Sequence, residues 1–226
     1  MSRVYLRPAC AQDLPSIADL AAQAMVEDEL FIHLCPHRYE HYADFRYGFV
    51  RRLKKRLVTP GYIIMVAVEQ EGQGVGEVIL LSPYVLPMVL PLTPPSALER
   101  KLLALEDSYL ALICPDRSVD PHRLAHYTAS ISDCFPFADY PDMWFLATLA
   151  VDPTFQRRGI GQQLVHWGLQ QAVRDNVSVG LEASVKGTGL YEKLGFRTIN
   201  TLELMPGIII RAMLYDQPLP SEQIHP

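Results

Sequence analysis

An apolar segment, a glycine-containing turn and an amphipathic segment follow one another over residues 143–175, and no other part of the chain constrains the fold as strongly. Met143 to Val151 has the apolar composition of a buried strand. From Gly159 to Asp175 apolar residues recur every three or four positions, which is the period of a helix with one buried face. Val177 to Glu182 is again apolar. The order strand, helix, strand predicts a βαβ unit within a mixed α/β fold.

The turn Gln156-Arg157-Arg158-Gly159-Ile160-Gly161 lies at the start of the predicted helix. Backbone N–H groups without partners and the helix dipole favour a phosphate there, and glycine lets a ligand approach the main chain. The turn therefore predicts a phosphate-bearing ligand. Two alternatives are a helix start without a ligand and a dinucleotide site in which Glu182 holds a ribose. The dinucleotide pattern lacks its third glycine, because position 164 is Leu.

A second motif, Leu190-Tyr191-Glu192-Lys193-Leu194-Gly195-Phe196, follows about thirty residues later. Gln-x-x-Gly-x-Gly followed at this distance by Leu-Tyr-Glu-Lys-Leu-Gly-Phe resembles the GNAT superfamily of acetyl-CoA-dependent N-acetyltransferases. Trp144 to Thr148 and Leu181-Glu182 are similar to the puromycin-type branch. The resemblance implies the GNAT acyltransferase fold with a mixed sheet, in one domain that spans residues 1–226.

The resemblance also implies where acetyl-CoA binds. Its pyrophosphate is expected on the backbone amides of Gln156, Arg157, Arg158, Gly159, Ile160, Gly161 and Gln162. Its pantetheine arm is expected to run like an added strand along Leu149, Ala150 and Val151, where two strands of the sheet splay apart.

Two residues are candidates for proton transfer. Tyr191 is expected to act as the general acid that protonates the departing CoA thiolate; the alternative is a tyrosine that only packs beneath the cofactor. Glu182 is expected to act as the general base, although it could instead face solvent or pair with Lys186, and an ordered water could take its place. Glu27, Asp28 and Glu77 are weaker candidates for the base or for binding the acceptor. Residues 183–190 are expected to form a loop.

A proline-rich helical insertion, residues 83–141, separates the third and fourth expected strands. Together with the helix expected over 37–57, it is expected to form the acceptor wall, and its aromatic and aliphatic content favours a small-molecule acceptor with a primary amine. The predicted reaction is acetyl transfer by direct attack in a ternary complex. A protein or peptide acceptor, or a non-catalytic acyl-CoA-binding module, is the alternative.

Composition excludes other partners. The net charge of −5 and pI near 5.8 argue against nucleic acid. Prolines interrupt the longest apolar stretch, Val78 to Leu92, so no membrane span is expected. The four cysteines lack metal-ligand spacing, and His122 and His126 lack a third ligand, so no metal is expected. Free thiols and the absence of a signal-peptide pattern predict a cytoplasmic protein. The oligomeric state, a homodimer included, stays open.

The other expected elements complete the chain. They are a strand over 3–7, a helix over 14–25 capped by Asp13, a helix over 37–57, a hairpin over 62–69 and 75–81, helices over 96–113 and from Asp120-Pro121, and strands over 198–205 and 208–214.

Overall fold

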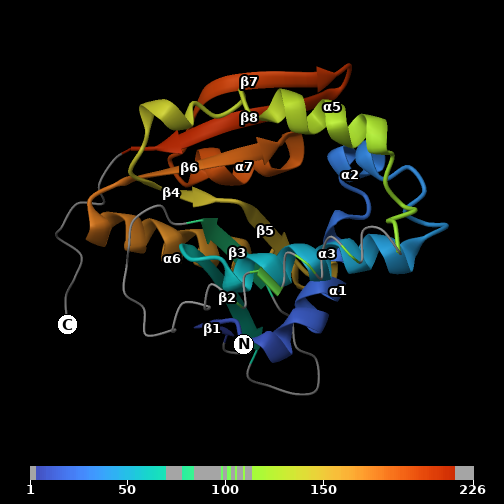
Figure 1. Ribbon diagram of the computed structural model, residues 1–226. Helices are drawn as coiled ribbons and strands as arrows, with labels where there is room; N and C mark the ends of the chain where they lie inside the picture. The colour runs from blue at the N-terminus through green and yellow to red at the C-terminus, as the bar shows by residue number, and fades with distance from the viewer. Residues whose placement is uncertain are drawn as a thin grey trace.

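The computed structural model describes residues 4–69, 78–83, 98, 101, 102, 105, 109 and 114–216 of the chain. Within these residues, eight strands form two four-stranded sheets, with the orders β1-β2-β3-β5 and β4-β6-β8-β7 (Figure 1). The strands are β1 (Val4–Pro8), β2 (Tyr62–Glu69), β3 (Val78–Pro83), β4 (Met143–Leu146), β5 (Thr148–Val151), β6 (Ser178–Ser184), β7 (Arg197–Met205) and β8 (Ile208–Tyr215). The helices are α1 (Leu14–Met25), α2 (Glu29–Leu34), α3 (Tyr42–Val58), α5 (Pro121–Ile131), α6 (Ile160–Asp175) and α7 (Val185–Lys193).

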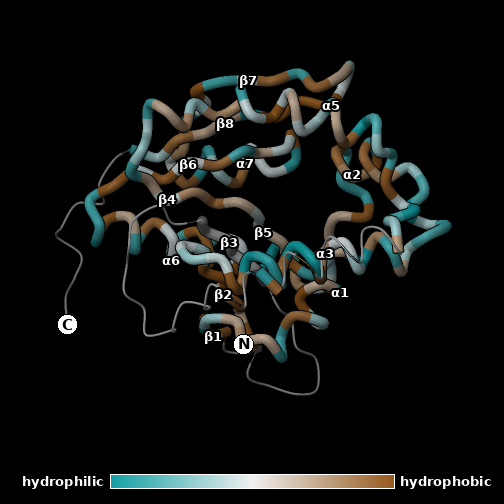
Figure 2. The backbone as a smooth tube through the Cα atoms, in the orientation of Figure 1, coloured by the Kyte–Doolittle hydropathy of each residue, from teal (hydrophilic) through white to brown (hydrophobic). Residues whose placement is uncertain are grey.

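Two layers of helices enclose the sheets. The side chains of β2 alternate: Met65 and Ala67 belong to the core cluster that contains the buried face of α6, whereas Ile64 and Val66 pack against α1 and α3. Figure 2 accordingly shows β2 as mainly hydrophobic, whereas α3 includes a hydrophilic stretch. On the α1 and α3 side of the molecule, α5 packs over the second sheet. The mixed α/β architecture that the sequence predicts is confirmed.

The expected strand over 143–151 is broken at Ala147, and the break joins the two sheets. Residues 143–146 run parallel to 178–181 of β6, while residues 148–151 pair antiparallel with β3. Trp144 and Leu146 pack on the α6 side, and the next residues of the strand to do so are Leu149 and Val151. The alternation therefore slips by one residue, which is the signature of a β-bulge and bends the strand.

Several predicted boundaries need correction. Residues 36–41 form turns, and α3 begins only at Tyr42, because the buried guanidinium of Arg38 donates to the carbonyl oxygen of Val26 at 2.6 Å and fixes this segment. The short helix α2 was not predicted. Asp13 does not cap α1, because its carboxylate accepts hydrogen bonds from Arg7 at 2.7 and 2.8 Å.

The predicted loop over 183–190 is also wrong. Strand β6 continues to Ser184, and α7 starts directly after it with the Ser184 hydroxyl accepting a hydrogen bond from the Gly187 N–H at 3.4 Å.

The remaining predictions hold where they can be followed. The helix after Asp120-Pro121 is α5, and the strands over 198–205 and 208–214 are β7 and β8. Strand β3 pairs antiparallel with β2 as expected, although residues 75–77 and most of the helix predicted over 96–113 lie outside the described residues.

Candidate acyl-CoA and acceptor site

The turn before α6 has a backbone suited to an anion. Gly159 has a φ of +78° and Arg157 a φ of +60°, a left-handed conformation that side-chain-bearing residues seldom adopt. Alternation of left-handed with other conformations turns successive N–H groups toward one side and forms an anion-binding nest. The N–H of Gln163 makes the first bond of α6, to the Gly159 carbonyl oxygen at 3.0 Å. The N–H groups of Ile160, Gly161 and Gln162 precede that bond and are available to a ligand.

Side chains hold this turn against the end of β5. The Gln156 amide donates to the Val151 carbonyl oxygen at 3.1 Å. The guanidinium of Arg158 lies 4.8 Å from the centre of the Phe155 ring. A Cβ added at Gly161 would meet side-chain atoms of Val151 and Leu149 at 3.6 and 3.7 Å. The two segments in which the sequence predicts cofactor contacts, 149–151 and 156–162, therefore lie side by side.

Strands β5 and β6 diverge beside this turn. The pairing of β4 with β6 ends at Leu146 and Leu181. Beyond it β5 pairs with β3 and forms the edge of its sheet, while residues 182–184 of β6 pair with β8. Among the described residues, no strand pairs with the edges of β5 and of this part of β6 that face each other. An extended amide-containing chain can pair with such an edge.

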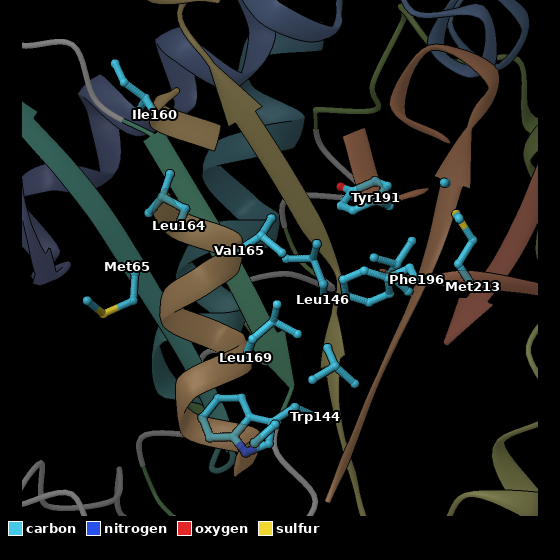
Figure 3. Close-up of a cluster of buried hydrophobic side chains, with 14 of the residues drawn as sticks. Met65, Trp144, Leu146, Ile160, Leu164, Val165, Leu169, Tyr191, Phe196 and Met213 are labelled. Carbon is cyan, nitrogen blue, oxygen red and sulfur yellow. The ribbon is translucent and has the colours of Figure 1, made fainter. Parts of the chain in front are cut away.

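Tyr191 lies on the α6 side of the opening. Its side chain is buried, and its ring packs against Phe196 with centroids 5.7 Å apart. Figure 3 shows Tyr191 within this core cluster, with its oxygen pointing away from Phe196. Burial raises the pKa of the phenol, so it stays protonated and can donate. None of the described residues forms a hydrogen bond with its hydroxyl.

Glu182 lies on the opposite side of β6. Leu181 and Ala183 pack toward α6, so strand alternation directs Glu182 to the α5 side with Gly180, which lies against the Phe135 ring. Burial raises the pKa of its carboxyl from 4.5 to about 7, which matches a base working near neutral pH. Its expected alternative partner, Lys186, instead donates to the Glu27 carbonyl oxygen at 2.8 Å.

Two further titratable side chains lie on the acceptor side: Tyr127, which is near Glu182, and Asp28, which is near Tyr127. Tyr127 of α5 is half-buried and packs both against the cluster of α1, α2 and α3 and against the cluster on the second sheet. Burial, followed by Glu182, raises the pKa of its phenol to about 12. Asp28 caps α2 by accepting from the Leu30 N–H at 3.0 Å, and burial raises its pKa.

The sequence did contain a signal for the opening between β5 and β6. The apolar positions shift from Trp144 and Leu146 to Leu149 and Val151, which strict alternation along one strand does not allow.

Two further findings concern the described residues only. No three side chains of His, Cys, Asp or Glu among them lie close enough together to hold a metal ion. None of the helices in this part of the chain has the length and apolar composition that a bilayer crossing requires.

Comparison with known proteins agrees with this geometry. A family model described as an acetyltransferase (GNAT) domain matches residues 126–198, which include the turn, β6 and α7. A protein of the fungus Stachybotrys chartarum named "Acetyltransferase" is 26% identical over 199 residues, covering 88% of this chain and 83% of that protein.

Solved structures share the fold. A crystal structure described as histone acetyltransferase HPA2 and related acetyltransferase, from Corynebacterium glutamicum, superimposes with a TM-score of 0.63 at 21% identity, over 98% of this chain and 99% of that one. A polyamine N-acetyltransferase from Drosophila melanogaster has a TM-score of 0.56 at 15% identity, over 94% of this chain and 99% of that one. At these identities the likeness extends to the fold and not to the acceptor.

Proposed function

We propose that this chain, which carries a GNAT acetyltransferase domain and is an acetyl-CoA-dependent N-acetyltransferase, acetylates the primary amine of a small molecule. The observation that carries the proposal is the opening between β5 and β6, with Tyr191 and Glu182 on its two sides. An acyl donor and an amine that reach a sheet from opposite faces meet within such an opening. Direct transfer in a ternary complex needs that arrangement.

The turn before α6 and the edge of β5 would bind the donor. The N–H groups of Ile160, Gly161 and Gln162 would hold the pyrophosphate, and the edge of Leu149 to Val151 would bind the amides of the pantetheine arm. Arg157 adds positive charge at the same turn. An N–H of β5 beside the thioester would stabilise the negative charge that develops on its oxygen.

The two titratable residues would share the proton transfers. As the amine nitrogen bonds to the acetyl carbonyl carbon, Glu182 takes the proton that the nitrogen loses. As the carbon–sulfur bond breaks, Tyr191 gives its phenolic proton to the sulfur, so free CoA leaves as a thiol. The carboxyl pKa near 7 leaves a large fraction of Glu182 ionised at neutral pH.

Acceptor size follows from what surrounds Glu182. The carboxylate is half-buried, and Tyr127 from the segment 83–141 closes over the same region. A compact amine reaches a half-enclosed carboxylate more readily than a folded protein surface does. The wall role of residues 83–141 is part of this proposal.

A thiol-release assay tests the function. Purified protein with acetyl-CoA is given a panel of primary amines with aliphatic or aromatic bodies, and in parallel lysine-containing peptides. Turnover on at least one small amine, abolished in Glu182→Gln, supports the proposal. Turnover confined to peptides would assign a protein acceptor instead. Acetyl-CoA binding without turnover on either panel would contradict both acceptor classes.

A further inference from the structure

Lys186 connects two parts of the acceptor side that are 159 residues apart in the sequence. Its ammonium donates to the Glu27 carbonyl oxygen at 2.8 Å and lies 3.5 Å from the Glu29 carboxylate. Lys186 is in the first turn of α7, directly after β6 ends at Ser184. The link between α1 and α2 is therefore fixed beside the end of the strand that carries Glu182.

The element held by this contact has little stability of its own. Helix α2 spans only Glu29–Leu34, and so short a helix does not persist without tertiary contacts. Its last residue, Leu34, is buried, and the ring of Phe31 packs on Phe45 and Phe49 with centroids 5.8 and 5.3 Å apart. These contacts fix the later part of α2. Before the first residue of α2, Lys186 acts together with the Arg38 guanidinium on the Val26 carbonyl oxygen and the Tyr39 hydroxyl on the Glu27 carboxylate.

We propose that Lys186 is a positioning residue for the acceptor: by holding the α1–α2 link, it keeps α2 packed against α5, the helix whose Tyr127 forms the acceptor wall beside Glu182. The proposal rests on the proposed function, because it assumes that the amine binds on this side of β6. Tyr127 packs against both the cluster of α1, α2 and α3 and the cluster of the second sheet. Lys186, in the first turn of α7, joins the α1–α2 link to the helix that follows β6 by a hydrogen bond. Lys186 touches neither reacting group.

A positioning role and a general stabilising role predict different effects of losing the Lys186 contact. The Lys186 and Glu29 side chains are 60% and 36% exposed, and ion pairs of that kind contribute little to global stability. Loss of the contact instead lowers the fraction of molecules whose acceptor site is assembled. The apparent Michaelis constant for the acceptor rises in inverse proportion to that fraction. We expect acceptor KM to rise by about fivefold to tenfold, the equivalent of one hydrogen bond with its ion pair. The kcat and the acetyl-CoA KM should change by less than about twofold.

The variants are Lys186→Met, Lys186→Arg, Glu29→Gln and the control Lys193→Met. Lys193 is an exposed lysine at the other end of the same helix. Arginine can still donate to the Glu27 carbonyl, so Lys186→Arg should restore most of the acceptor affinity. Glu29→Gln removes the ion pair but keeps the 2.8 Å hydrogen bond, so its effect should be smaller than that of Lys186→Met.

Steady-state kinetics with the best amine are combined with hydrogen exchange of residues 26–34. A selective rise in acceptor KM in Lys186→Met, with faster exchange in this segment, supports the proposal. Unchanged acceptor KM, or equal loss for both substrates, overturns it. If the wild type acetylates no amine, the proposed function fails and the acceptor role fails with it. Exchange in residues 26–34 then reports separately whether Lys186 holds α2.

Discussion

Replacing Glu182 by glutamine should stabilise the folded protein at alkaline pH and abolish its activity. Burial raises the carboxyl pKa from 4.5 to about 7. Between those two pH values the native state retains a proton that the unfolded chain has released, so wild-type stability falls as pH rises through this window. At 1.36 kcal/mol per pH unit, the ionised carboxylate destabilises the native state by at most about 3 kcal/mol. The half-buried position lowers the actual figure, because solvent screens part of the charge.

Glutamine does not titrate, so this loss should be absent from the variant. The free energy of unfolding, measured by urea titration at pH 4 and pH 8, should show the gap between variant and wild type widening toward pH 8. A widening of 2–3 kcal/mol would correspond to a relative gain of roughly 5–10 °C in melting temperature for a domain of this size. The other groups that titrate between pH 4 and pH 8 are common to both proteins, so their contributions cancel in the comparison.

Activity supplies the second half of the test. Wild-type kcat/KM should fall on the acidic side with an apparent pKa near 7, reaching about a tenth of its maximum at pH 6. The glutamine variant should lose about a hundredfold or more in kcat. Glu203→Gln is the matched control, because Glu203 is an exposed glutamate on β7 of the same sheet. If the difference in free energy of unfolding between variant and wild type does not change with pH, the burial of the Glu182 carboxylate is refuted. If the glutamine variant retains activity, the role of Glu182 as base is refuted.

Four further substitutions, one of them a control, test other parts of the structure. Tyr191→Phe should lower turnover by about a hundredfold and leave acetyl-CoA affinity within about twofold; near-normal turnover in single-turnover kinetics would remove Tyr191 as the acid. Gly180→Ala should destabilise the fold by about 1–3 kcal/mol, because the new Cβ would lie 2.4 Å from the buried Phe135 ring. Gly189→Ala, with nothing within 4 Å of its Cβ, should not destabilise it, so equal losses in thermal unfolding would contradict this packing. Gly159→Ala should cost about 1–2 kcal/mol in the left-handed conformation and raise the acetyl-CoA Kd by about tenfold in calorimetry; unchanged affinity would argue against the nest.

Local signals explain which parts of the site the sequence predicts. Gly159 and Asn176 both have left-handed backbones at the two ends of α6, so its boundaries follow from single residues. The same holds for Asp120, whose carboxylate accepts from the N–H groups of His122 and Arg123 at the start of α5. The adjacency of the turn and β5 follows from the short connection between them.

Contacts between segments that are distant in the sequence were harder to predict. A carboxylate four residues away was the natural partner for Lys186, but the fold brings Glu27 and Glu29 closer. Asp13 has the residue type of a helix cap, yet Arg7 takes its carboxylate. The division of the fourth strand depends on which neighbour each half pairs with, and only the change in phase at Ala147 and Thr148 indicates it in the sequence.

Hydrogen–deuterium exchange of the purified protein, with and without saturating acetyl-CoA, tests the central claim most directly. The account predicts that acetyl-CoA slows exchange in two separate segments, the amides of 159–162 and those of 149–151, while α5 and β7 change little. Protection confined to other segments, or no protection at a concentration that saturates binding, would contradict the placement of the donor between the turn and the opening of β5 and β6.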